Sequence, residues 1–178
     1  MPLELSVLGL KRGTVQVVSY NPAWPELFLA EQRRLQLALG VDSSLIVHVG
    51  STAVPGLAAK PIIDILVAID DLADYERYIP LLADLGYTFM PERVFADRVF
   101  LPKGLPERRT HHLSLVAKDS PAWRDPIRFR DMLRADPGVR QAYQALKEQL
   151  AAEHSDDRAS YTAAKAAFIE RILDKEEA

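Results

Sequence analysis

The sequence predicts an α/β domain of the α+β type, in which helices pack against a mixed, mainly antiparallel sheet. Short apolar runs rich in Ile and Val have the length of buried strands. Segments with apolar residues at helical spacing alternate with these runs in the first half of the chain and predict a pair of helices there. The C-terminal third has helical spacing alone, so we expect a helical segment packed over the sheet.

The N-terminal part is expected to form an arm, an edge strand and a helix. Residues 1–13 have no clear period and predict a loosely attached arm, whereas residues 14–19 alternate weakly, as an edge strand does. Asn21 and Pro22 are a helix start signal, and Gly40 is a stop signal. Apolar residues recur at helical spacing between these signals: Trp24, Leu27, Phe28, Leu35 and Leu39.

Two buried strands and a second helix are expected next. The apolar runs 45–47 and 62–67 have the length and branching of buried strands, and only the second contains a charge, Asp64. Asp70 and Asp71 are expected to cap the following helix, which Gly86 ends.

The region from Tyr87 to Lys118 has a short, β-like pattern. We expect strands at 87–89, 98–101 and 111–116, with a turn or a mobile loop at 102–106. In the last of these strands alternate residues point to opposite faces, which groups His112 with Ser114 and Val116.

The last third predicts three helices in a single domain that spans residues 14–173. Plausible helix starts are Ser120-Pro121, Asp136-Pro137 and Ser155-Asp156. Residues 174–178 are expected to form a charged tail.

The composition excludes several classes of protein. A chain of 178 residues suits one domain with a substantial core. There is no cysteine, which excludes disulfides and thiolate metal sites. No apolar run has the length of a membrane span, and the N-terminus lacks the apolar region of a signal peptide. We therefore expect a cytoplasmic protein without a membrane partner.

The charge is distributed unevenly. The net charge of −3 argues against nucleic acid as a partner, because nucleic-acid binders present a basic surface. Residues 92–147 carry 12 basic and 7 acidic residues, a net charge of +5, while each flanking part has a net charge of −4. A basic central third suits a small anionic ligand, although a solvated surface explains it equally well.

One short stretch gathers residue types that handle anions. Gly50, Ser51 and Thr52 follow the first buried strand, and successive backbone N–H groups in such a turn can form an anion-binding nest. Lys60 brings a cation to the same neighbourhood. A carboxylate at Asp64, inside a buried strand, must find a cation, a metal or hydrogen-bond donors.

Three cations lie on or beside the apolar faces of the C-terminal helices. Arg130 falls within an apolar arc, Lys165 lies near the centre of another, and Lys147 lies at the edge of a third. Snorkelling explains any one of them, but three favour an internal anionic partner. We expect Arg130 and Lys165 to project into one cavity with Ser51 and Asp64, and Lys147 to lie nearer the rim.

The motif HVGSTAVPGLAAKPIIDILV, residues 48–67, resembles the signature of the GrpB family. That family is similar to the nucleotidyltransferases, whose usual motif is G-S followed by D-x-D, and it also occurs fused to dephospho-CoA kinase. Further segments agree with the family: YNPAWP at 20–25, THHLSL at 110–115 and FRDMLR at 129–134. Residues 143–147 and 161–168 agree as well. The resemblance covers roughly residues 14–173.

The resemblance implies a nucleotidyltransferase-like fold and a ligand that is a phosphate-bearing nucleotide or a nucleotide-like cofactor related to coenzyme A. By analogy His112 faces Asp64, and the pair holds one divalent cation, Mg²⁺ or another, or acts as a general base. Ile62 occupies the first position of the D-x-D motif, which puts two-metal transfer in doubt. The alternative to a transferase is a non-catalytic module that supports a partner such as dephospho-CoA kinase.

Overall fold

The computed structural model describes residues 7–14, 16–153 and 158–176. The α-helices in this part of the chain are α2 (Trp24–Leu39), α3 (Ile79–Asp84), α4 (Pro121–Ala135), α5 (Pro137–Glu153) and α6 (Arg158–Glu176). The strands are β1 (Ile46–Val49), β2 (Ile63–Ile69), β3 (Arg98–Leu105) and β4 (Arg108–Ala117). Short 3₁₀ helices are η1 (Ser43–Leu45), η2 (Ser51–Ala53), η3 (Leu72–Tyr78) and η4 (Pro91–Arg93).

The strands form one mixed sheet in the order β1-β2-β4-β3. β1 pairs with β2 and β3 pairs with β4 in antiparallel fashion, whereas β2 and β4 are parallel. The parallel pair is central, so both of its strands are covered on two faces, as parallel strands usually are.

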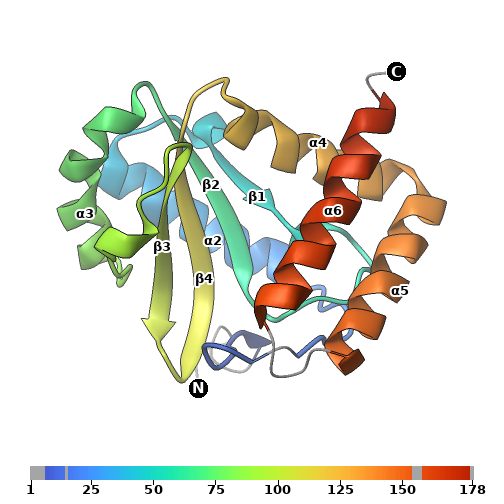
Figure 1. The fold of residues 1–178 in the computed structure, drawn as a ribbon. Helices are drawn as coiled ribbons and strands as arrows, with labels where there is room; N and C mark the ends of the chain where they lie inside the picture. Colours follow the sequence, from blue (N-terminus) through green and yellow to red (C-terminus); the bar gives the residue numbers. More distant parts are fainter. Residues whose placement is uncertain (1–6, 15, 154–157, 177–178) are drawn as a thin grey trace.

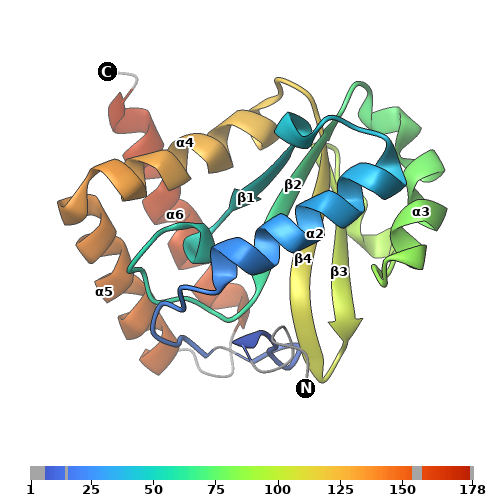
Figure 2. The same ribbon diagram turned by 180° about the vertical axis from the view of Figure 1, so that it is seen from behind.

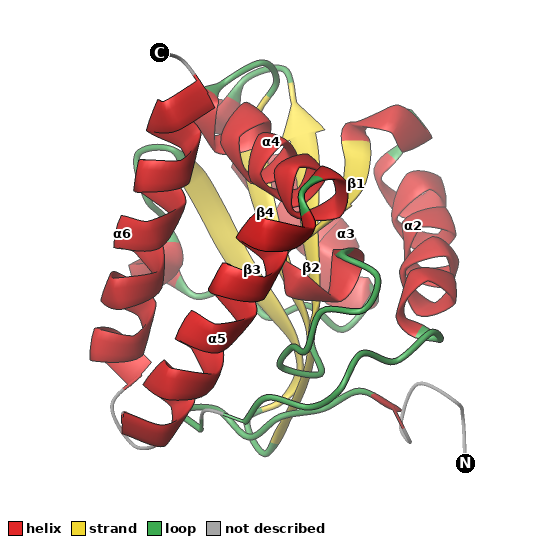
Figure 3. Cartoon of the chain, turned by 90° about the vertical axis from the view of Figure 1, so that its right-hand side faces the viewer, coloured by secondary structure: helices red, strands yellow, loops and turns green. Residues whose placement is uncertain are grey.

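Helices cover both faces of this sheet and make three layers. α2 crosses one face (Figure 2) and α3 lies at the β3 side of it (Figure 1). α4, α5 and α6 lie together over the opposite face, as the side view shows (Figure 3). This arrangement confirms the expected α/β (α+β) fold class, with N-terminal helices and a C-terminal helical segment packed over a mixed sheet.

The alternation of side chains along β2 and β4 separates two environments. Ile63, Ile65 and Val67 of β2 are buried in the main core, which contains α2 and β3 residues as well. The other face carries Asp64 and Leu66. In β4 the same alternation places His112 and Ser114 on the face of Asp64, as the sequence predicted. One face of the sheet is therefore dry, whereas the other can bear chemistry.

The predicted end of α2 is confirmed, whereas its start is shifted, because the N-cap is Ala23 and not Asn21. The Asn21 side chain accepts a hydrogen bond from the Ala23 N–H at 2.9 Å, and the helix begins one residue later, at Trp24. Gly40 ends the helix in the left-handed conformation, with a φ of 65°, and its N–H donates to Gln36 O. Both termini thus follow from local chemistry.

Three expectations about strands and one about a helix are wrong. The described residues of the segment 14–19 contribute only an isolated bridge, between Val18 and Ala59, and residues 87–89 contribute only one between Tyr87 and Lys103. The expected loop at 102–106 lies largely within β3, because an edge strand tolerates the missing N–H of Pro102. The helix expected after Asp71 is mostly a 3₁₀ helix, η3, and only its continuation α3 is α-helical.

Residues 7–10 of the N-terminal arm are buried or partly buried, contrary to expectation, whereas residues 11–13 are exposed. Leu8 is buried in the main core, and Leu10 is buried beside it. The Gly9 N–H donates to Pro61 O, and Leu10 exchanges two backbone hydrogen bonds with Arg109. Apolar burial and backbone hydrogen bonds attach this segment to the domain. The sequence predicted neither, because the segment has no periodic pattern.

At the other end, α6 includes Asp174 and continues to Glu176, so the expected tail is partly helical. The remaining tail residues, 177–178, and the Ser155-Asp156 helix start lie outside the described residues. Within the described part of the chain, no helix has the length and apolar character needed to cross a membrane.

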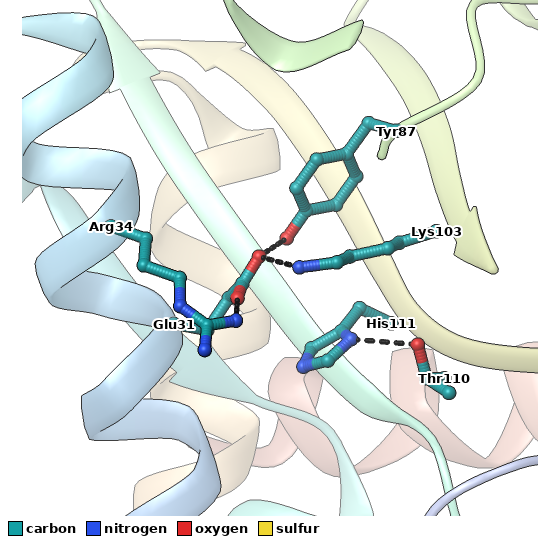
Figure 4. Close-up of polar contacts among 6 residues, drawn as sticks. All are labelled: Glu31, Arg34, Tyr87, Lys103, Thr110 and His111. Atoms are coloured by element: carbon teal, nitrogen blue, oxygen red, sulfur yellow. Dashed lines mark hydrogen bonds and ion pairs between the residues drawn. The ribbon is translucent and has the colours of Figure 1, made fainter. Parts of the chain in front are cut away.

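A buried polar cluster joins α2 to the edge of the sheet (Figure 4). Glu31 is 2% exposed, and its Oε1 accepts hydrogen bonds from Lys103 Nζ at 2.7 Å and from the Tyr87 hydroxyl at 2.9 Å. Burial by itself would raise the pKa of Glu31, but Lys103 chiefly reverses this effect, and the pKa is lowered. Arg34 contacts the other carboxylate oxygen at 3.3 Å. The cluster fixes the position of α2 on the dry side of the sheet.

Candidate functional site

A cavity of about 460 Å³ lies on the Asp64 face of the sheet, with α4, α5 and α6 contributing side chains to it. The ribbon view shows these helices standing over that face (Figure 3). Every site residue predicted from the sequence lines the cavity: Gly50, Ser51, Thr52, Lys60, Asp64, His112, Arg130, Lys147 and Lys165. The fold therefore brings together residues separated by up to 115 positions in the chain.

The glycine–serine turn connects β1 to the cavity. Gly50 has a φ of 72°, a left-handed conformation that favours glycine, and Ser51 then begins the 3₁₀ helix η2. Thr52 is 1% exposed, and its hydroxyl is hydrogen-bonded to His48 Nε2 at 2.9 Å and to Ile62 O at 3.3 Å. The Thr52 hydroxyl thus holds the turn in place, and Ser51 is the residue of the pair whose side chain is partly exposed.

Asp64 and His112 face each other across the parallel strands β2 and β4. They are register partners, and His112 Nδ1 lies 3.3 Å from Asp64 Oδ1. The Asp64 side chain is 41% exposed, so the expectation of a buried carboxylate is wrong. Because the exposed carboxylate lines the cavity, it is available to a ligand.

Two arginines of α4 hold the backbone that supports the turn. Arg130 Nη1 donates to His48 O at 2.8 Å, and Arg130 Nε contacts the Asp131 carboxylate at the same distance. Arg134 donates from Nε and Nη2 to Ala53 O, at 2.9 and 2.7 Å. Arg130 therefore projects into the predicted cavity, but part of its hydrogen-bonding capacity serves the protein itself.

The sequence predicted Lys147 near the rim of the cavity. This prediction is wrong, because the residue is only 2% exposed. Its Nζ donates to Ser51 Oγ at 3.0 Å and to Ala58 O. The pKa of Lys147 is lowered to about 7, chiefly by burial, and the nearby cations Lys165 and Lys60 contribute to this shift while Glu148 opposes it. A helical wheel gives the direction of this side chain but not its depth, which the packing of Tyr143 and α6 determines.

Aromatic residues of α4, α5 and α6 complete the wall of the cavity. Lys60 Nζ lies 4.4 Å from the centre of the Tyr161 ring and Lys165 Nζ lies 5.2 Å from it, both within the range of cation–π attraction. The Tyr143 ring packs edge-on against Phe129 at 5.1 Å. Burial raises the pKa of Tyr143, although a hydrogen bond with Ser51 opposes the shift.

Four further cations were not singled out from the sequence. The cavity is also lined by Lys11, Arg12, Arg98 and Arg109, whereas its carboxylates among the described residues are Asp64 and Asp125. The only signal that pointed towards this excess was the positive charge of residues 92–147, which contain two of the four. The lining is strongly cationic although the whole chain is acidic.

The donor set for a metal is small. Among the described residues, no group of three or more histidines and carboxylates is arranged to hold a metal ion. Asp64 and His112 supply one carboxylate and one imidazole side by side. A hard cation such as Mg²⁺ takes mostly oxygen ligands and is often held by one or two carboxylates together with substrate phosphates. The pair therefore fits a cation only when the ligand supplies the remaining oxygens.

Comparison with known proteins gives a consistent result. Residues 14–175 match the family described as GrpB protein. The chain is 35% identical to the glutamate-rich protein GrpB of Alkalihalophilus pseudofirmus, over 95% of this chain and 99% of that protein. It is 38% identical to the UPF0157 protein YqkA of Bacillus subtilis over 94% of this chain, which spans only 49% of that protein.

A solved structure and one further group of relatives extend the comparison. The crystal structure of the conserved protein GrpB from Enterococcus faecalis has a TM-score of 0.78 and 34% identity, and the match covers 92% of this chain and 100% of that one. The chain is also 30% identical to a dephospho-CoA kinase of Mycolicibacterium paratuberculosis, over 91% of this chain but 46% of the kinase.

Proposed function

The chain belongs to the GrpB family, and we propose that its cavity binds a phosphate-bearing nucleotide or a nucleotide-like cofactor. The excess of cations in the lining carries this proposal. Eight Lys and Arg residues and two carboxylates line the cavity. Like charges confined in a cleft with low-dielectric walls focus their field and attract a ligand of opposite sign. A ligand with several negative charges matches this lining best.

The residues closest to the turn are assigned to the phosphate groups. Ser51 would donate its hydroxyl, and Gly50 lets the backbone of the turn approach the ligand closely. Lys60 and Lys165 would neutralise charge from either side of the Tyr161 ring. Arg130 would add a planar guanidinium group, which suits the oxygens of a phosphate.

The second part of the proposal concerns transfer. Asp64, with His112 beside it, would hold one divalent cation together with the phosphates of the ligand, or would accept a proton from an acceptor hydroxyl. When bound, such a cation would polarise a phosphoryl oxygen. The apolar Ile62 leaves the first carboxylate position of the D-x-D motif empty of charge, so the proposed transfer uses a single cation.

A second candidate is an accessory module without catalysis. It is supported by the similarity of this chain to less than half of a dephospho-CoA kinase, whose remaining length lies outside the match. In that case the cavity would bind a coenzyme A precursor and would support a kinase partner. The two candidates agree on the ligand class and differ on turnover.

A thermal-shift screen tests the proposal, because a ligand that binds the folded state raises its apparent stability by mass action, by about 2.7 kcal/mol at a hundred times the Kd. ATP, GTP, dephospho-CoA and pyrophosphate would each be tested with and without Mg²⁺. We expect a rise in melting temperature that Lys165→Met abolishes and that the exposed control Lys118→Met retains. Equal responses of the two variants would contradict binding in the cavity.

Turnover separates the two candidates. A transferase consumes nucleoside triphosphate when an acceptor is present, and the release of pyrophosphate or phosphate measures that consumption. An accessory module binds the same ligand unchanged and instead alters the rate or stability of a dephospho-CoA kinase mixed with it. Asp64→Asn should abolish turnover in the first case and leave the kinase effect in the second.

A further inference from the structure

Ser51 and Lys147 form a pair whose arrangement exceeds what phosphate binding requires. Lys147 Nζ lies 3.0 Å from Ser51 Oγ, a hydrogen-bonding distance. Ser51 is partly exposed to the cavity, whereas Lys147 is buried behind it. A lysine that serves only to neutralise an anion would be expected to present its ammonium group to the ligand. Here the buried amine is hydrogen-bonded instead to the more exposed hydroxyl.

We propose that Ser51 and Lys147 are a nucleophile and its general base, so that Ser51 Oγ attacks a phosphorus atom of the bound ligand while Lys147 Nζ accepts the hydroxyl proton. This inference rests on the proposed function for the class of ligand and adds a covalent step to it. Burial assigns the roles: the partly exposed serine can reach an electrophile, whereas the buried lysine is held by its hydrogen bonds to the serine and to Ala58 O.

The hydrogen bonds around the pair suit these roles. A neutral lysine can direct one N–H to Ala58 O and turn its lone pair towards Ser51 Oγ. Tyr143 also shares a hydrogen bond with Ser51, and burial keeps its phenol protonated. Lys147, Ser51 and Tyr143 thus form a chain in which each hydroxyl can donate to its neighbour while the amine accepts.

The charged groups around Lys147 favour its neutral form. Lys165 on α6 and Lys60 before β2 oppose a further positive charge, and burial acts in the same direction, whereas Glu148 on α5 acts against them. The resulting pKa of about 7 leaves a large share of Lys147 able to accept a proton near neutral pH. Tyr143, the other titratable group of the hydrogen-bonded chain, stays uncharged at that pH.

The proposed step balances without a further reactant. A bond forms between Ser51 Oγ and phosphorus, and the bond from phosphorus to a terminal phosphate or diphosphate breaks, with its electron pair leaving on that anion. The serine proton moves to Lys147 Nζ. In the second half, water or an acceptor hydroxyl displaces Ser51 Oγ, Lys147 returns the proton to the serine, and the acceptor's proton passes to solvent. Lys60 and Lys165 lie where they can offset the charge on the phosphoryl oxygens.

Labelling with a fluorophosphonate ester tests the pair, because this phosphorus electrophile reports on nucleophilicity and needs no phosphate recognition. The full chain would be incubated with the ester, and intact mass and peptide mass would locate the adduct. We expect one adduct, on Ser51, that Ser51→Ala abolishes. Lys147→Met, of similar size, should slow labelling at least about 100-fold, since a general base contributes about 10²–10⁴-fold.

Exposed residues of the same types provide the controls. Ser44→Ala and Lys118→Met should label at the rate of the unaltered chain. If Lys147→Met does not fold, the unaltered chain still decides: its labelling rate should rise between about pH 5 and about pH 9 with a midpoint near 7. An adduct elsewhere, or labelling of Ser51 that depends on neither pH nor Lys147, would overturn the inference.

The same preparation separates this inference from the proposed function. In one outcome, ATP raises the melting temperature but Ser51 does not react with the ester. This result would overturn the covalent step and would leave the proposed phosphate binding unaffected. Base-dependent labelling of Ser51 that ATP does not slow would support the nucleophile and contradict the proposed ligand. Protection of Ser51 by ATP, with a phosphorylated or nucleotidylated Ser51 on prolonged incubation, would support both.

Discussion

Gly50 and Asp64 touch in a way that only glycine permits. A Cβ atom on Gly50 would lie 2.5 Å from Asp64 Oδ2 and 3.2 Å from Asp64 Cβ, and both distances are too short for a normal contact. The left-handed backbone of Gly50 brings the turn down onto the carboxylate. The glycine–serine turn and the strand that carries Asp64 are therefore one unit, and a change in either should displace the other.

Replacing Gly50 with Ala should harm the protein more than the same change at Gly40. Gly40 has the left-handed α conformation, with φ 65° and ψ 24°, in which alanine costs about 1–2 kcal/mol, whereas Gly50, with φ 72° and ψ −173°, lies in a region essentially restricted to glycine, so its variant is strained more. Only at Gly50 does the new methyl group meet a neighbour, whereas nothing lies within 4 Å at Gly40. Urea unfolding measures both losses, and equal values would refute the contact.

Asp64→Asn should abolish the effect of Mg²⁺ on nucleotide binding while the fold survives. The side chain is 41% exposed, so its loss of charge leaves no buried ion behind, and we expect a change in stability below about 1 kcal/mol. Titration calorimetry with and without Mg²⁺ gives the result, and Asp70→Asn, at an exposed site, is the control. An unchanged Mg²⁺ effect in Asp64→Asn would remove Asp64 from the metal site.

Arg134→Lys should loosen the turn. The guanidinium group donates twice to Ala53 O, and a lysine can replace only one of these bonds. We expect a loss of about 1 kcal/mol and faster hydrogen exchange in residues 51–54. Arg124→Lys, on the same helix, is the matched control. Exchange rates that rise equally in both variants would contradict a specific role for Arg134.

Acid should destabilise the fold well above the range in which ordinary carboxylates titrate. Burial lowers the pKa of His48 to about 3 and that of His111 to about 4, from 6.5. The unfolded chain therefore binds more protons below pH 6.5, and stability falls by up to about 1.4 kcal/mol per pH unit for each histidine. The pKa of Glu31 is lowered from 4.5, so its protonation causes a further loss of stability as the pH falls below 4.5. Urea midpoints that do not change between pH 6.5 and 4.5 would contradict this.

Binding of a triphosphate should take up protons near pH 8. Lys147 has a pKa of about 7, and a nearby anion favours its charged form, so at pH 8 the bound state holds more protons than the free state, while the share of Lys147 that remains neutral can still act as the base. Calorimetry in buffers of different ionisation enthalpy measures this uptake. The Lys147→Met variant should show no proton uptake on binding. The Lys165→Met variant should bind more weakly but should still take up protons. A binding enthalpy that is independent of the buffer would exclude the linkage.

How much the sequence could predict depended on the kind of signal. Patterns local to one element were sufficient for α2, for β2 and for the face that His112 shares with Asp64, because period and caps are properties of a few neighbouring residues. The sequence also predicted that the site residues lie together in one cavity. This prediction rested on the two strands that carry some of them and on the cations that lie on apolar helix faces.

Features that depend on distant partners could not be predicted. The depth of Lys147 is determined by residues of the turn and of α6, and the burial of Leu8 by the main core, neither of which leaves a trace in the neighbouring sequence. Pro102 was taken as a turn residue, since nothing local shows that its strand lies at the edge of the sheet. The burial of Glu31 could not be predicted either, because its partner Lys103 lies 72 residues away in the sequence.

The position of Lys147 also constrains the order of events during synthesis. Ser51 leaves the ribosome early, but its partner Lys147 follows 96 residues later, and Tyr161 and Lys165 come later still. The sheet needs β4 before β2 has a parallel neighbour, and the wall of the cavity needs α6. A nascent chain thus holds the turn without the rest of the cavity until α6 has been made, so the proposed ligand binding and serine activation can begin only after that point.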